Sequence, residues 1–353
     1  MGTTNKVLVL TLLSPLAALA LHGGQAAPSP LPHPRGYVCV RAAAPPAIDG
    51  RLDDEAWRRA PWTDDFVDIE GDLRPRPTLR TRVKMLWDDE FLYVGAELAE
   101  PHLWATLKEH DSVIFHDNDF ELFIDPNGDN HEYYEFEINA LNTGWDLLLP
   151  IPYKDGGHAV NGWEIRGLKT AVHLDGTLND ASDVDRGWSV ELAVPWAALG
   201  ELAGRPAPPR EGDQWRVNFS RVEWPVRIDG RDYAKVTGAN EHNWVWSPQH
   251  VIDMHRPETW GYVQFERTLR PFVPDASWPA RRWLQSVYYA ERDYQRTHGR
   301  YATSLDELGM IAPLTDGLRA AAVGATLDRW ESCVGTGGQE WCIREDSKLW
   351  ERK

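Results

Sequence analysis

The sequence alternates apolar and polar residues over many short segments between residues 37 and 268. In one of the clearest, apolar Val83, Met85 and Trp87 alternate with basic Arg82 and Lys84. The same period of two recurs in segments 119–125, 135–139, 188–194 and 215–220. This period is typical of strands with one buried face. Because Gly, Pro, Asn and Asp separate the segments, we predict an all-β fold: an antiparallel β-sandwich of jelly-roll or immunoglobulin-like type.

Helices are predicted in four places, and the two within the sandwich are short. The pattern favours helical turns at 53–60 and 196–202, after a first strand at 37–41. Beyond Pro274, apolar residues recur at helical spacing from about residue 277 until Gly299, which offers a stop. Ser304 and Glu307 form a capping-box sequence that predicts a short second helix. We therefore expect residues 275–353 to form a small helical and hairpin region, to which we assign no function.

The N-terminal residues have the layout of a secretory signal. Lys6 precedes the apolar run 7–13, and small residues follow up to Ala26. We predict a signal peptide at 1–26, a proline-rich linker at 27–36 and a sandwich domain at 37–268, in a protein exported to the periplasm or the extracellular space. The apolar run is too short for a permanent span and no comparable segment follows, so we expect no membrane span.

Charge and cysteine content narrow the function classes. The formal net charge of −17, without a basic patch, disfavours nucleic acid as a partner because phosphates would be repelled. Cys333 and Cys342 enclose a glycine-rich segment that can turn the chain back, and we predict a disulfide between them. Cys39 is expected to be a buried small residue.

Acidic residues concentrate on two consecutive predicted strands. If a turn at 126–130 pairs these strands, their carboxylates form a cluster that repels itself unless it faces water, a cation or a ligand. A sugar site, a calcium site and a solvated face remain open interpretations. The residues of the cluster are Asp119, Glu121, Asp125, Glu135, Glu137 and Asn139.

The predicted turn itself is rich in oxygen ligands. Asp125, Asn127 and Asp129 have the spacing of a calcium loop, although the segment departs from the EF-hand pattern. A simple hairpin turn explains these residues equally well. Structural calcium is therefore a possible cofactor, and no other cofactor is expected.

Five conspicuous segments follow one another along the chain. They are 48–57 (IDGRLDDEAW), 83–94 (VKMLWDDEFLYV), 118–125 (NDFELFID), 187–191 (GWSVE) and 256–261 (RPETWG). In this order they resemble segments of family 9 carbohydrate-binding modules, and we call them the family segments. The resemblance covers residues 37–268. It implies a β-sandwich that binds the ends of sugar chains, often contains structural calcium and commonly accompanies glycoside hydrolases.

The resemblance also assigns candidate sugar-binding residues. Phe115 takes the place of one stacking tryptophan of the family, and Met254 is the best match to the position of the second tryptophan. Glu121 matches the acidic residue that binds the sugar. On the next strand, Glu137 stands where the family has arginine, and Asn139 matches its asparagine. The two-tryptophan clamp of the family is therefore not retained in this chain.

Aromatic residues beside turns are further candidates, because a sugar ring needs a flat apolar surface with polar partners around it. Trp145 follows a turn, and Trp246 lies near Pro248. We expect the alternating tryptophans on strands to fill the core instead.

Together these patterns predict non-catalytic binding of a polysaccharide or oligosaccharide outside the cytoplasm, linked to polysaccharide breakdown. No catalytic residue is nominated. One alternative is a glycoside hydrolase that uses the acidic strands. The separation of the carboxyl groups decides whether they can serve as its acid and base. Another is an envelope interaction module whose sugar site has decayed. The sequence leaves the oligomeric state open.

Overall fold

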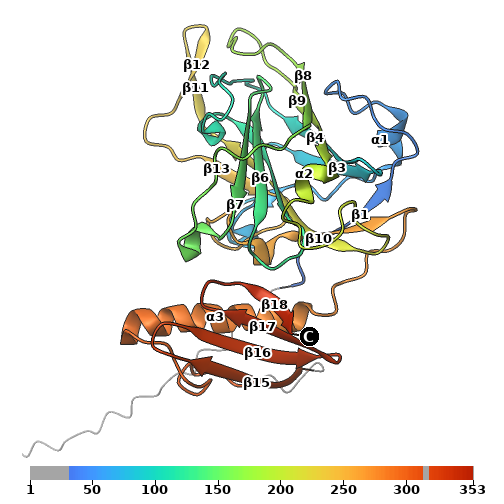
Figure 1. The fold of residues 1–353 in the computed structure, drawn as a ribbon. Coiled ribbons are helices and arrows are strands. Elements are labelled where there is room, and N and C mark those ends of the chain that lie inside the picture. The colour runs from blue at the N-terminus through green and yellow to red at the C-terminus, as the bar shows by residue number, and fades with distance from the viewer. Residues whose placement is uncertain (1–31, 313–317, 353) are drawn as a thin grey trace, which may run out of the picture. The chain divides into compact units, whose positions relative to one another are not determined.

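The computed structural model describes residues 32–312 and 318–352, so the predicted signal peptide at 1–26 lies outside the described residues. Most of the described chain is β-structure, as the alternation predicts (Figure 1). The strands of the large sheet are β1 (Gly36–Arg41), β2 (Val67–Asp68), β3 (Thr81–Trp87), β4 (Phe91–Ala99), β5 (Asp119–Asp125), β6 (Tyr133–Asn139), β7 (Gly144–Leu149), β8 (Lys169–Asp175), β9 (Gly187–Pro195), β10 (Gln214–Glu223), β13 (His242–Val245) and β14 (Gly261–Glu266).

This large sheet is mixed, which corrects the prediction of a purely antiparallel one. Its main path runs β7-β6-β5-β10-β14-β1-β3-β4-β9-β8. Strand β1 pairs in parallel with β14 along Gly36–Val40 and, at its other end, in parallel with β3 at Val40 and Arg41. Alternation of side chains is the same in parallel and antiparallel strands, so the sequence pattern does not encode this direction.

The two halves of the sheet share one hydrophobic core, because the sheet curls on itself. Val83 and Leu192 come from one half, and Phe120, Phe219 and Val263 come from the other. The rings of Phe120 and Phe219 stack with centroids 5.8 Å apart. Burial of such large apolar side chains is the main stabilising contribution to the fold.

Short helices and a two-stranded ribbon complete this part of the chain. The predicted turns at 53–60 and 196–202 correspond to α1 (Glu55–Arg59) and α2 (Trp196–Leu199). Strands β11 (Val226–Asp229) and β12 (Asp232–Lys235) form the ribbon. The 3-10 helices are η1 (Gly71–Leu73), η2 (Ile114–His116), η3 (Tyr153–Asp155) and η4 (Pro257–Thr259).

The C-terminal region consists of one long helix and a four-stranded antiparallel sheet. Helix α3 (Trp278–His298) ends where Gly299 adopts a left-handed conformation with φ 69°, as the sequence predicts. It packs against the sheet of β15 (Leu318–Ala325), β16 (Trp330–Thr336), β17 (Gln339–Arg344) and β18 (Leu349–Arg352) (Figure 1). Among residues 32–312 and 318–352, no helix is both long and apolar enough to cross a membrane.

The second helix predicted after Ser304 does not form. The Ser304 hydroxyl does accept the Glu307 N–H at 3.3 Å, but the segment closes into turns that end at Gly309. A capping box satisfies the first N–H groups of a helix and does not by itself extend one, because nucleation of a short helix is unfavourable.

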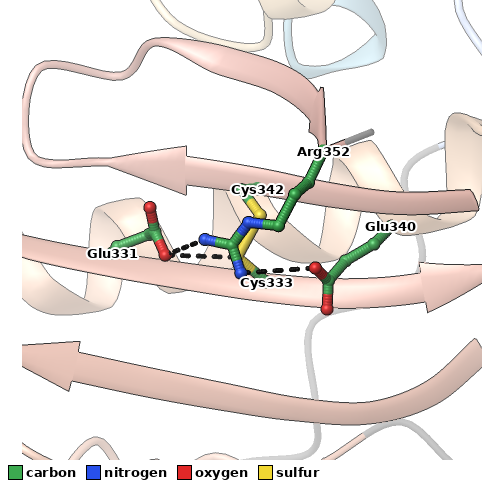
Figure 2. Close-up of a disulfide and its surroundings, with 5 residues drawn as sticks. All are labelled: Glu331, Cys333, Glu340, Cys342 and Arg352. Atoms are coloured by element: carbon green, nitrogen blue, oxygen red, sulfur yellow. Dashed lines mark hydrogen bonds and ion pairs between the residues drawn. A yellow bond between two sulfur atoms is a disulfide. The ribbon is translucent and has the colours of Figure 1, made fainter.

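A disulfide joins Cys333 to Cys342, the two cysteines that the sequence analysis pairs. They lie directly opposite each other on β16 and β17, and Figure 2 shows the bond with Arg352 of β18 beside it. The guanidinium of Arg352 forms ion pairs with Glu331 and Glu340 on the same two strands. Gly337 and Gly338 make the connecting turn, and both have positive φ, which glycine adopts without strain.

Candidate functional site

The two acidic strands pair as the sequence predicts and bring their carboxyl groups together. In the antiparallel register of β5 and β6, Glu121 lies opposite Glu137, and Phe123 lies opposite Glu135. Asp119, Glu121 and Glu137 each offer an oxygen within 4.8 Å of the others. All of these carboxyl groups are buried, so the cluster is not a solvated face.

A cavity of about 280 Å³ opens over this cluster. The volume lies at the lower end of the range for small-molecule sites. Its walls combine carboxyl groups, aromatic rings and aliphatic side chains from β5, β6, β7 and the loops around them. The lining residues include Phe115, Glu121, Glu135, Glu137, Trp145, Tyr153, Met254 and His255.

Aromatic rings form two sides of the cavity. The rings of Phe115 and Trp145 have centroids 6.4 Å apart and an interplanar angle of 30°. The Phe115 N–H donates to the Glu137 carboxylate at 2.9 Å, which holds the backbone of η2 against β6. On the other side, Tyr153 and His255 contact edge to face with centroids 4.4 Å apart. The cavity therefore presents flat apolar surfaces next to acidic groups.

Burial shifts the pKa values of the ionisable side chains that line the cavity. It raises the pKa of Glu121 to about 7. Burial and the charge of Glu121 raise the pKa values of Glu135 and Glu137 well above their ordinary range. Burial likewise lowers the pKa of His255 to about 4, which leaves its ring neutral at neutral pH, with Nδ1 2.9 Å from the Tyr133 hydroxyl.

Three polar atoms of the lining residues have no hydrogen-bond partner within the described part of the chain. They are Oε2 of Glu121, Oε2 of Glu135 and Nε1 of Trp145. Buried polar atoms are nearly always paired, so unpaired ones beside a cavity indicate a missing partner. Two carboxyl oxygens and one N–H match the hydroxyl groups of a polar ligand.

The structure brings together five of the seven candidate sugar-binding residues. Phe115, Glu121, Glu137, Trp145 and Met254 all line the cavity.

Asn139 and Trp246 lie elsewhere. The amide of Asn139 is used by the neighbouring loop: its Nδ2 donates to the Leu107 carbonyl at 2.8 Å, and its Oδ1 accepts the Thr143 N–H at 3.1 Å. Trp246 is 1% exposed and packs in the core against Phe219. The sequence placed Trp246 beside a loop, but Gly261 lacks a side chain and makes room for the ring.

The oxygen-rich turn after β5 is built as a hairpin turn. Both oxygens of Asp125 accept backbone N–H groups, from Gly128 at 2.7 Å and Asn130 at 2.9 Å. Asn127 Oδ1 accepts the Asp129 N–H at 2.9 Å, and Asp129 forms an ion pair with Lys348 at 3.3 Å. A calcium ion would have to replace these interactions, so calcium at this turn stays a prediction.

Sequence reasoning missed Tyr153, Ile252 and His255 as cavity residues. Tyr153 follows the bend at Pro150 and Ile151, so the criterion that selected Trp145, an aromatic residue beside a turn, would have found it. His255 directly follows Met254 and could have been placed with it. Ile252 carries no chemical signal, and its position depends on how the loop after β13 folds.

Comparison with known proteins places residues 48–210 in a family. These residues match the model described as "Carbohydrate family 9 binding domain-like". The chain is 28% identical over 162 residues to exoglucanase XynX of Acetivibrio thermocellus, which covers 45% of this chain and 12% of that protein. It is 29% identical over 154 residues to endo-1,4-beta-xylanase A of Thermotoga neapolitana, covering 44% of this chain and again 12% of the relative.

Solved structures give a weaker similarity. A family 9 carbohydrate-binding module of Caldicellulosiruptor kristjanssonii, in complex with cellotriose, aligns with 68% of this chain and 100% of its own, at 17% identity and a TM-score of 0.44. The chain spans only about an eighth of the curated relatives, so the match concerns a module of those proteins. Four of the five family segments lie within residues 48–210, the region that matches the carbohydrate family 9 binding domain-like model.

Proposed function

We propose that this protein binds carbohydrate outside the cytoplasm and does not transform it. The observation that carries the proposal is the cavity in which two neighbouring aromatic rings, Phe115 and Trp145, tilted by 30° to each other, lie beside buried carboxyl groups with unpaired oxygens. A sugar ring has weakly polar C–H faces and hydroxyl groups around its edge. Aromatic surfaces suit the faces, and carboxyl oxygens accept the hydroxyl protons.

The chemical class of the ligand follows from the relatives. By name they are an exoglucanase and xylanases, and two solved family 9 modules were bound to cellotriose and to glucose. We propose a β-linked glucan or xylan oligosaccharide as the ligand. A role beside polysaccharide-degrading enzymes follows from the same relatives.

Replacement of the aromatic pair tests the proposal. Phe115→Ala or Trp145→Ala should weaken binding of cello- or xylo-oligosaccharides roughly 5- to 10-fold or more, since aromatic contacts contribute about 1 kcal/mol or more beyond burial. Isothermal titration calorimetry measures the change. Phe91→Ala is a matched control, because Phe91 is also half-buried but lies on β4, away from the cavity. Full affinity in both cavity variants would reject the site.

Glycoside hydrolysis is the second candidate, because the carboxyl groups of Glu121 and Glu137 lie within 4.8 Å of each other. Hydrolysis requires one protonated and one ionised carboxyl group. Here burial raises both pKa values, and the Glu137 carboxylate already accepts the Phe115 N–H. Binding is therefore favoured. Release of reducing sugar by the wild type that is lost in Glu121→Gln would reverse this preference.

Export and a sandwich architecture complete the proposal. The signal-like sequence at 1–26 supports export to the periplasm or beyond, and a disulfide between Cys333 and Cys342 is compatible with an oxidising compartment. The core shared by both halves of the curled sheet supports a β-sandwich. Detection of the mature chain in a periplasmic or culture fraction, with its N-terminus determined by sequencing, tests export.

A further inference from the structure

A second cluster of ligand-type side chains lies outside the sugar cavity. His110 and Asp111 follow β4, Asp146 lies on β7, and Glu164 lies in the loop before β8. The His110 Nε2 atom is 3.4 Å from Asp111 Oδ1, 3.6 Å from Asp146 Oδ1 and 3.3 Å from Glu164 Oε2. One imidazole nitrogen and three carboxylate oxygens thus converge from three separate segments.

Asp146 supplies an independent indication of a missing partner. Its side chain is only 3% exposed. Its Oδ2 accepts the Ile165 N–H, but its Oδ1 has no hydrogen-bond partner within the described residues and faces His110 Nε2. A buried carboxylate oxygen without a partner is costly and needs an explanation.

The orientation of the His110 ring also indicates a missing metal ligand partner at this cluster. Its Nδ1 lies 3.0 Å from the Gly144 carbonyl oxygen, which can only accept a hydrogen bond. Nδ1 must therefore carry a proton, which leaves Nε2 as the ring atom that faces the carboxylates and is available to a metal ion. A backbone carbonyl that fixes the outer nitrogen is the usual arrangement around a metal-binding histidine.

We propose that His110, Asp111, Asp146 and Glu164 bind one divalent transition-metal ion, with zinc as the best match. Tetrahedral zinc with bonds of about 2.0–2.2 Å has its ligand atoms about 3.3–3.6 Å apart. The three distances from Nε2 fall in this range. The imidazole ligand argues against calcium and magnesium, which prefer oxygen ligands throughout.

An ion at this position would connect the segments that carry the aromatic pair of the sugar cavity. Asp146 directly follows Trp145 on β7, and His110 and Asp111 lead into η2 with Phe115. Asp111 also donates its N–H to the Gly144 carbonyl at 3.1 Å, so the two segments are already adjacent. The metal would fix the spacing of Phe115 and Trp145, a consequence that rests on the proposed sugar site.

Zinc binding by the full chain, purified without a histidine tag, tests the metal site directly. Wild-type protein dialysed against zinc should retain one ion per chain by mass spectrometry of the metal and should show a higher Tm with zinc. His110→Gln and Glu164→Gln should each weaken zinc binding at least roughly 10-fold. Both positions are exposed enough for the fold to tolerate the change, which circular dichroism checks. His158→Gln, at an exposed histidine outside the cluster, should bind zinc as the wild type does.

Equal zinc retention in the wild type and in both variants, or no retention by the wild type, would overturn the proposal. Stabilisation by calcium alone, unaffected by His110→Gln, would overturn it as well. The sugar titration is a separate readout: zinc binding without sugar binding supports the metal site and contradicts only the proposed function. Sugar binding without a difference in zinc retention between the wild type and the variants supports the proposed function and contradicts only the metal site.

Discussion

Glu121 illustrates how burial changes the chemistry of a single carboxyl group. The group sits on the floor of the cavity with one oxygen unpaired, and its pKa rises from the ordinary 4.5 to about 7. Between these two values the folded chain holds a proton that the unfolded chain has released. The folded state is therefore favoured at the acidic end of this range, and its advantage is lost as pH rises toward 7.

We expect the free energy of unfolding to fall between pH 4.5 and 7, with a contribution from Glu121 on the order of 3 kcal/mol. Glu121→Gln should reduce this slope, because the amide does not titrate. Urea denaturation across the pH range measures it. The surface variant Glu109→Gln should leave the slope unchanged, and a wild-type slope in Glu121→Gln would contradict the assignment.

At the scale of elements, two family segments meet at one carboxylate. Glu191 of β9 accepts the indole N–H of Trp57 at 2.6 Å and the backbone N–H groups of Asp49 and Gly50 at 2.8 and 2.7 Å. Trp57, the buried residue of α1, is 0% exposed. Gly50 has φ 86°, and a Cβ there would lie 2.5 Å from the backbone of His173, so no other residue suits the turn.

Glu191→Ala would leave three donors without their acceptor. We expect the free energy of unfolding to fall by roughly 3–5 kcal/mol, since each buried donor left unpaired costs about 1–3 kcal/mol. Glu191→Gln retains an acceptor oxygen and should lose clearly less. Chemical denaturation of both variants provides the comparison, and equal small losses would show that the carboxylate does not hold the segments together.

The sequence predicted elements well where the information is local. The pairing of β5 with β6 follows from a period of two and a short turn, which fix the face and the register of Glu121 and Glu137. The parallel pairing of β1 could not be predicted, because alternation encodes neither partner nor direction. Trp246 and Asn139 were misplaced since their contacts, with Gly261 and Leu107, come from distant segments.

At the scale of the whole molecule, Asp155 connects the large sheet to the C-terminal region. Its carboxylate, 2% exposed, accepts hydrogen bonds from Tyr288 and Ser347 and forms an ion pair with Arg292 at 3.0 Å. Tyr153 of the cavity lies on the same short helix, η3. The C-terminal region therefore supports one wall of the proposed sugar site.

Asp155→Ala should lower the free energy of unfolding by roughly 3 kcal/mol, because the hydroxyl groups of Tyr288 and Ser347 lose their acceptor and the partly exposed Arg292 loses its ion pair. It should also weaken oligosaccharide binding through Tyr153. Hydrogen exchange should accelerate in α3 and around Ser347. Asp155→Asn retains acceptors and should show a smaller effect. Unchanged exchange in α3 would mean that the connection contributes nothing measurable.

Strand β1 has a further consequence, for the order of folding. It lies near the beginning of the described chain, yet its main partner is β14, more than two hundred residues later. During synthesis this strand can pair only at its end, with β3, until β14 has emerged, so the two halves of the core cannot join through β1 earlier. Contacts over such long loops are slow to form. Until β14 pairs with β1, strand edges stay exposed, and the chain must avoid aggregating through them.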